Sequence, residues 1–286
     1  MSQESPQKAT IIGISGPSSS GKTTLARLLQ RIFCGVNLAH GNANANANTH
    51  LNTFIIHEDD FYFPDDQIPT VTLPSGKQIQ DWDTASAIDI PFLSKALTYV
   101  RQNGTLPPRL RSKEDQNDKA DSGVPDGVVR ELRDMVERSL SSLSSSEQGM
   151  VQTVAFLEGF LLFSPPVDTS TNEAQKKKQH ILRPVHDAIN LHLFLPASYE
   201  LVKARREGRS GYVTIGPAPD VSDATNTNTT NNESGDVDLE AEDDRPPQNF
   251  WTDPPGYVDD IVWPRYVEDH SWLLIADEKE GGSGND

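Results

Sequence analysis

The sequence predicts a three-layer α/β fold in which a parallel sheet of about five strands lies between helices. The run Thr10–Ser15 is short and β-branched and leads at once into a glycine loop. Apolar residues then recur at helical spacing from Lys22 to Phe33. Further strand-length apolar runs alternate with helical patterns along the chain, which is typical of parallel sheets.

The remaining elements follow from the same periodicities. We expect strands at Thr53–His57, Val151–Leu157, Ile189–Leu195 and Trp272–Ala276, and helices at Ile88–Arg101 and Ala197–Arg206. Residues 1–286 then form a single domain with low-complexity inserts at 40–50, 103–149 and 216–248. The second insert should be peripheral, with a helical pattern only at Val128–Leu140. The third has almost no apolar residues and should be disordered.

Composition narrows the classes of function. The chain has 42 acidic and 25 basic residues and a formal charge of −17, so its surface should repel nucleic acid and anionic lipid. Cys34 is the single cysteine, which excludes an internal disulfide and a cysteine-built metal cluster. No apolar run has the length of a membrane span and residues 1–10 show no secretory signal, so we expect a cytoplasmic protein. No pattern indicates the oligomeric state.

The segment from Gly16 to Thr23, Gly-Pro-Ser-Ser-Ser-Gly-Lys-Thr, fits the Walker A pattern of phosphate-binding loops. Its glycines let successive N–H groups face a phosphate, and the helix that follows adds its positive N-terminus. Lys22 would reach the β- and γ-phosphates of ATP, and the Thr23 hydroxyl would ligate Mg²⁺. A serine-rich turn with a chance Gly-Lys-Thr is the alternative. The predicted ATP-binding residues here are Gly16, Ser18, Ser19, Ser20, Gly21, Lys22, Thr23 and Thr24.

Glu158 ends the apolar run Val154–Leu157, as in a Walker B motif with Glu in place of the commoner Asp. At the carboxyl edge of the sheet such a carboxylate would face the phosphate loop and hold Mg²⁺ or its water shell. The alternative is an ordinary strand-end acid that caps the next turn.

An acidic turn follows the expected strand Thr53–His57 and contains two candidates for the proton acceptor of a phosphoryl transfer, Asp59 and Asp60. The pattern does not choose between them, and either could instead cap a helix or a turn.

Three arginines, Arg205, Arg206 and Arg209, lie on or just after an expected helix of an otherwise acidic chain. They would form either a lid over the transferring phosphate or a solvated basic face. Aromatic residues in expected loops, among them Trp82, Tyr212 and Trp251, are candidates for stacking on a base, although many such residues only cover core edges.

These motifs resemble the nicotinamide riboside kinases, in a fungal-type version, within the uridine kinase-like P-loop kinases. The resemblance is carried by the Walker loop, Asp59-Asp-Phe-Tyr, Glu158-Gly-Phe-Leu-Leu-Phe, and the stretch from Asp253-Pro-Pro-Gly-Tyr to Trp263-Pro-Arg-Tyr. Outside the inserts it covers most of residues 10–276. Insert 216–248 departs from the family because it splits the connection after the lid.

The resemblance implies a role for each matching residue. Asp59 would accept the proton of the ribose 5′-hydroxyl, with Lys22 as the second catalytic residue, and Glu158 would organise Mg²⁺ together with Thr23. The nucleoside would be gripped by the pair Trp82–Asp83, with Asp83 on the ribose hydroxyls. The lid would fall on Arg206, toward the ribose, on Arg209 and on the aromatic Tyr212. Together with the pattern of three arginines, this makes Arg205 and Arg209 the expected contacts of ATP.

The expected reaction is therefore the ATP- and Mg²⁺-dependent phosphorylation of a small-molecule nucleoside, nicotinamide riboside, to nicotinamide mononucleotide in NAD biosynthesis. Nicotinic acid riboside is a plausible second substrate. A uridine/cytidine kinase on the same scaffold is the nearest alternative, and a non-catalytic nucleotide-binding module is the second. The presence of Lys22, Asp59 and Glu158 disfavours the second alternative.

Overall fold

A computed structural model of the chain describes residues 7–38, 49–108, 110, 112, 121–142, 152–166, 180–214, 216 and 249–273. Its centre is a parallel sheet of four strands in the order β4-β7-β1-β8. The strands are β1 (Ala9–Ser15), β4 (Asn52–His57), β7 (Thr153–Gly159) and β8 (Leu191–Phe194). All seven residues of β7 are buried, as expected for an apolar strand with paired neighbours on both sides.

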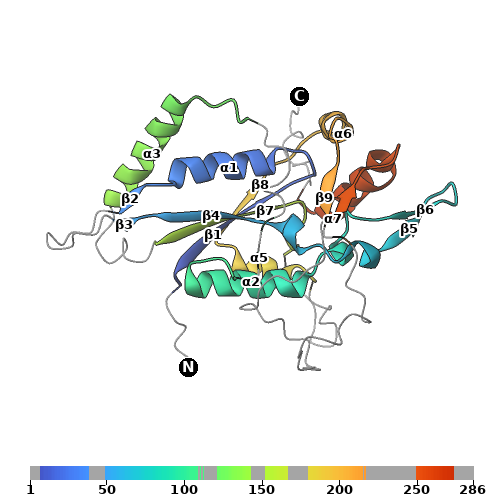
Figure 1. The fold of residues 1–286 in the computed structure, drawn as a ribbon, viewed down its shortest axis with the longest axis horizontal. Helices are drawn as coiled ribbons and strands as arrows, with labels where there is room; N and C mark the ends of the chain where they lie inside the picture. Colours follow the sequence, from blue (N-terminus) through green and yellow to red (C-terminus); the bar gives the residue numbers. More distant parts are fainter. Residues whose placement is uncertain are drawn as a thin grey trace, which may run out of the picture.

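Helices cover both faces of this sheet (Figure 1). On one face, α1 (Lys22–Phe33) packs on β4 and β7, and α3 (Asp126–Ser141) packs on α1. On the other face, α2 (Ile90–Asn103) packs on β1 and on α5 (Arg183–Ala188). The molecule is thus a three-layer α/β fold, as the sequence predicted.

The sequence explains the limits of the long helix α2. The Asp89 side chain accepts a hydrogen bond from the Phe92 N–H, which caps the helix, and Pro91 fits the first turn because it needs no donor there. Gly104 ends the helix in the left-handed conformation, with φ 74°. The helix therefore starts at Ile90 rather than at Ile88, where the hydrophobic periodicity alone began.

Smaller elements lie at the carboxyl end of the sheet, beside the end of β1 (Figure 1). They include α6 (Tyr199–Glu207) and a π-helix, Val258–Val262, that runs into α7 (Trp263–His270). Two antiparallel pairs belong to this region, β5 (Thr70–Thr72) with β6 (Gln78–Gln80), and β9 (Tyr212–Thr214) with β10 (Asn249–Trp251). Short 3-10 helices occupy Glu58–Phe61, Asp65–Gln67 and Ala85–Ala87, and β2 (Asn37–Leu38) pairs with β3 (Thr49–His50).

The expected fifth strand at Trp272–Ala276 is wrong where it can be compared. Ser271 to Leu273 form a turn after α7, and 274–276 lie outside the described residues. The Trp272 indole N–H donates to the Asp269 carbonyl and the Leu273 N–H to the His270 carbonyl, so these donors close the helix end instead of joining a strand. The described sheet accordingly has four strands instead of about five.

The inserts differ from one another. The helix expected at Val128–Leu140 is confirmed as α3, which is attached to α1 rather than simply peripheral. Arg31 forms an ion pair with Asp126 at 2.7 Å, and Arg133 donates to the Arg31 and Ile32 carbonyls. The disorder expected at 216–248 concerns residues of which all but Gly216 lie outside the described part of the chain, as do 40–48. None of the described helices is long and apolar enough to cross a bilayer.

Candidate active site

The glycine loop joins β1 to α1 and lies at the carboxyl end of the sheet. Gly16 has φ 156°, and any side chain there would collide with the backbone carbonyl of Leu195, next to the end of β8. Gly21 is left-handed, with φ 105°, directly before the first turn of α1. Both glycines are therefore required by geometry, Gly16 by close approach and Gly21 by backbone conformation.

The polar side chains of this loop are arranged for an anion. The Lys22 ammonium donates to the Pro17 carbonyl at 2.9 Å, and burial lowers its pKa while the carboxylates of Glu158 and Asp59 oppose the shift. The hydroxyl oxygens of Ser19 and Ser20 are buried and have no hydrogen-bond partner among the described residues. Because buried hydroxyls without partners are costly, a bound phosphate fits this loop well.

Glu158 stands at the end of β7, where it meets both the glycine loop and β4. Its Oε1 accepts a hydrogen bond from the Thr23 hydroxyl at 3.0 Å and lies 2.7 Å from His57 Nδ1. Burial alone would raise the pKa of Glu158, but His57, Lys22 and Thr23 outweigh burial and lower it. A hydroxyl and an ionised carboxylate beside a phosphate loop are oxygen ligands that suit Mg²⁺.

The two candidate acids occupy different environments. Both belong to the 3-10 helix Glu58–Phe61, directly after β4. Asp59 lines the large cavity described below, whereas Asp60 is 2% exposed and does not line it. Of the two, Asp59 is therefore the one placed to meet a substrate.

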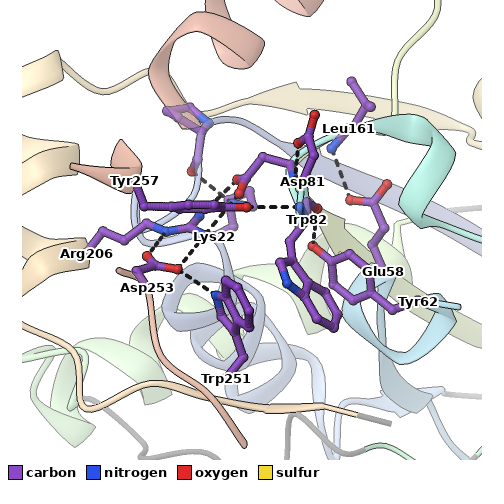
Figure 2. A network of polar contacts seen from close by, with 12 residues as sticks. Lys22, Glu58, Tyr62, Asp81, Trp82, Leu161, Arg206, Trp251, Asp253 and Tyr257 are labelled. Atoms are coloured by element: carbon purple, nitrogen blue, oxygen red, sulfur yellow. Dashed lines mark hydrogen bonds and ion pairs between the residues drawn. The ribbon is translucent and has the colours of Figure 1, made fainter. Parts of the chain in front are cut away.

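Arg206, on another part of the cavity wall, is held by two carboxylates, of which Asp253 is labelled in Figure 2. Its Nη1 and Nη2 donate to the two oxygens of Asp83 at 2.9 and 3.0 Å, and its Nε donates to Asp253 at 2.7 Å. Burial alone would lower the pKa of Arg206, but Asp83, Tyr212 and Asp253 raise it well above its usual value. The guanidinium thus links α6 to the loops that carry Asp83 and Asp253.

Aromatic rings surround this ion-pair cluster. Trp82 lies 5.4 Å from Trp251 and 5.3 Å from Tyr62 between ring centroids. Its backbone is held from both sides, because its N–H donates to the Tyr257 hydroxyl and its carbonyl accepts from the Tyr62 hydroxyl, each at 2.9 Å (Figure 2). Trp82 is only 5% exposed, so it belongs to the hydrophobic core as well as to the cavity wall.

Tyr212 lies between two guanidinium groups of the expected lid. The Arg209 Cζ is 4.2 Å from the centre of its ring and the Arg206 Cζ is 5.2 Å away. Arg205 turns the other way and donates to the carbonyls of Ser19 and Ser20, each at 3.2 Å. The arginines therefore do not form a purely solvated face: Arg205 contacts the glycine loop, whereas Arg206 contacts Asp83 and Asp253.

A single cavity of about 1150 Å³ connects these groups. Gly16 and the alternative acid Asp60 are the predicted residues that do not line it. The predicted residues on its wall are Ser18, Ser19, Ser20, Gly21, Lys22, Thr23, Thr24, Asp59, Trp82, Asp83, Glu158, Arg205, Arg206, Arg209 and Tyr212. The fold thus brings together residues from five separate stretches of sequence.

Sequence reasoning missed several residues here. Asp253 belongs to a motif of the family resemblance, but no role followed for it, although an acid beside Pro-Pro-Gly in an aromatic stretch is a usable signal. Asp121 and Ser122, from insert 103–149, also line the cavity, and no pattern pointed to them. Glu58 belongs to the acidic turn, but sequence reasoning assigned it no separate role. It is completely buried, and burial raises its pKa to about 8.

This fold and this site define the class: a P-loop kinase fold, with the glycine loop at the end of β1 and a carboxylate at the end of the neighbouring β7. No protein-family model matches the chain. It is 28% identical to the nicotinamide riboside kinase of Schizosaccharomyces pombe over 275 residues, which cover 96% of this chain and 85% of that protein.

Two further fungal nicotinamide riboside kinases are similar to this chain. The nicotinamide riboside kinase of Saccharomyces cerevisiae is 26% identical over 96% of this chain and 83% of its own length. That of Eremothecium gossypii is 24% identical over 92% of this chain and 77% of its own length. The resemblance to fungal nicotinamide riboside kinases that the motifs indicated is confirmed along nearly the whole chain.

Proposed function

We propose that the protein is a nucleoside kinase that transfers the γ-phosphoryl group of ATP to the ribose 5′-hydroxyl of nicotinamide riboside. The products are ADP and nicotinamide mononucleotide, an intermediate of NAD salvage. The observation that carries the proposal is the shared cavity, which is lined by Asp59, by the glycine loop and by the cluster of Arg206 with Asp83. The similarity to three nicotinamide riboside kinases supports this choice of substrate.

On the donor side, the N–H groups of the glycine loop and the first turn of α1 would bind the phosphates of ATP. Lys22 would move from the Pro17 carbonyl to the β- and γ-phosphates and offset the charge of the transferring group. Arg205 and Arg209 border the same space and would close over the phosphates. Thr23 and Glu158 would hold Mg²⁺, which when bound neutralises charge on the phosphate oxygens.

On the acceptor side, Asp83 would accept hydrogen bonds from the ribose hydroxyls while Arg206 keeps its carboxylate in place. Asp59 would orient the 5′-hydroxyl and take its proton as the oxygen attacks the γ-phosphorus in line with the leaving ADP oxygen. The enclosing residues would exclude water and so limit loss of ATP by hydrolysis.

Trp82 and Tyr212 are the proposed contacts of the nicotinamide ring. That ring is a pyridinium with a fixed positive charge, and aromatic faces attract cations by about 0.5–2 kcal/mol. Arg209 already stacks on Tyr212, so the substrate ring would replace one cation with another on that face. Nicotinic acid riboside shares the charged ring and is the proposed second substrate.

A coupled assay of ADP release tests the proposal. Purified protein, ATP and Mg²⁺ are combined with nicotinamide riboside, nicotinic acid riboside, uridine or cytidine, and kcat/KM is compared. We expect the two pyridinium ribosides to be preferred. A preference for uridine or cytidine would replace the proposal with the pyrimidine nucleoside alternative, and no turnover of any nucleoside would favour the non-catalytic one. The cytoplasm stays the expected compartment.

A further inference from the structure

Glu58 is a buried acid that the proposed reaction does not use. It is the residue directly before Asp59 and is completely buried. Its Oε2 accepts a hydrogen bond from the Leu161 N–H at 3.0 Å (Figure 2). Since Glu58 follows β4 and Leu161 follows β7, this bond connects the 3-10 helix Glu58–Phe61 (the Asp59 loop) to residues 158–161 (the Glu158–Leu161 loop).

Gly159, directly after Glu158, leaves the space that the Glu58 side chain occupies. A Cβ atom at Gly159 would lie 2.5 Å from the Cβ of Glu58 and 2.8 Å from its Cδ, closer than real Cβ contacts come. Gly159 is not among the glycines with positive φ, so an L-residue is excluded by space and not by backbone conformation. The backbone at the end of β7 therefore rests directly on the Glu58 side chain.

A buried glutamate would be unfavourable in free energy if its only role were to fill space. Glu58 Oε1 has no hydrogen-bond partner among the described residues, and burying an unpaired polar atom costs free energy that a leucine or methionine would avoid. What the side chain adds is an acceptor oxygen for the Leu161 N–H, three residues after Glu158. Glu58 does not itself line the cavity, whereas Asp59 and Glu158 do.

We infer that Glu58 is a positioning residue, which fixes the separation of the Asp59 loop and the Glu158–Leu161 loop. Because Glu58 holds these two loops together, Asp59 and Glu158 face the same phosphoryl group. The inference rests on the proposed kinase function and assigns Glu58 no direct part in proton transfer.

The test compares kcat and KM for four variants and one control variant of the full chain with ATP and the preferred riboside. Glu58→Ala removes the acceptor, and we expect kcat to fall on the order of 100-fold, since a shift of about 1 Å at reacting groups has that effect. KM for both substrates should change less than about three-fold, because the binding contacts remain. Glu58→Gln keeps an acceptor oxygen for Leu161 and should restore kcat to within about five-fold of wild type.

Gly159→Ala should reproduce the Glu58→Ala loss by pushing the acid away. The double variant Glu58→Ala/Gly159→Ala should lose no more than about what Gly159→Ala loses alone, because both changes break the same Glu58–Leu161 contact, although the Cβ at position 58 still crowds the new methyl group. Ser15→Ala is the matched control, since it removes a weaker contact to the same loop, at 3.4 Å from Leu162 N, without touching Glu58. It should keep near-wild-type kcat.

Several outcomes would overturn the inference. A fully retained kcat in folded Glu58→Ala would show that the hydrogen bond between Glu58 and Leu161 is dispensable. Additive losses in the double variant would show that Glu58 and Gly159 act independently. A Glu58→Gln variant as inactive as Asp59→Asn would assign Glu58 a chemical role. A wild-type enzyme that prefers another nucleoside would reject the proposed substrate but leave the comparison intact with that nucleoside.

Discussion

Arg206 and Asp83 form a bidentate ion pair in which both side chains are almost fully buried, at 6% and 7% exposure. Asp253 adds a second carboxylate to the same guanidinium at 2.7 Å. Arg206 thus lies between two acids that come from loops 170 residues apart in the sequence.

Arg206→Ala should leave these two acids uncompensated and lower the free energy of unfolding by about 3–5 kcal/mol, as found when one partner of a buried pair is removed. Denaturant unfolding followed by tryptophan fluorescence measures this loss. Lys203→Ala on the same helix is the control, because its pair with Asp259 is exposed and should contribute little. Equal stability of the two variants would contradict the buried-pair account.

Asp59→Asn should abolish turnover while nucleoside binding survives, because the amide keeps the shape of the side chain but not its basicity. Steady-state kinetics and nucleoside titration calorimetry separate the two effects. Asp60→Asn, the neighbouring buried acid, is the matched variant and should remain active if folded. An inactive Asp60→Asn beside a near-wild-type Asp59→Asn would reverse the assignment.

Trp82→Ala should weaken the use of nicotinamide riboside roughly ten-fold in kcat/KM and harm uridine less, since only the pyridinium gains from a cation–π contact. Because Trp82 also packs against Trp251 and Tyr62, the melting temperature of this variant should fall as well. Asp83→Ala should instead harm all ribosides about equally. Equal losses for charged and neutral nucleosides in Trp82→Ala would leave Trp82 with a packing role only.

His270 predicts a specific pH dependence of stability. It is buried in α7, where its Nδ1–H donates to the Tyr266 carbonyl at 3.0 Å, and burial lowers its pKa below the usual 6.5. Below pH 6.5 the unfolded chain therefore binds a proton that the folded chain resists, so stability is lost as the pH falls and is complete above 6.5. His270→Gln should reduce this acid-side slope in denaturant unfolding at several pH values. Identical slopes in wild type and His270→Gln would reject the prediction.

The pairing at the ends of β9 and β10 predicts that insert 216–248 can be shortened. Thr214 and Asn249 are paired directly in this antiparallel pair, and Gly216 is held by hydrogen bonds to Asp65 on both its N–H and its carbonyl. Replacing 217–248 by a short glycine-asparagine turn should therefore keep kcat/KM within a few-fold, because a shorter loop costs little to close. Loss of activity or solubility would show that the insert has a structural or regulatory role.

The sequence by itself determined the glycine loop, the strand-end Glu158 and the alternation of the four central strands with helices along the chain. These features are local: a glycine spacing, a run of β-branched residues or a repeat of leucines is encoded within a dozen neighbouring positions. The choice between Asp59 and Asp60 was not local, because both follow the same strand and differ only in what the rest of the chain packs against them.

Tertiary structure alone decided which of the polar residues meet. Nothing near Arg206 in the sequence indicates that it pairs with Asp83 and Asp253, and nothing near Glu58 indicates that its carboxyl reaches Leu161. Such contacts join the carboxyl ends of strands and the loops beyond them, which become neighbours only once the parallel sheet has formed. The energies of these buried groups depend on that enclosure, so burial, charge pairing and shifted pKa values appear only in the folded chain.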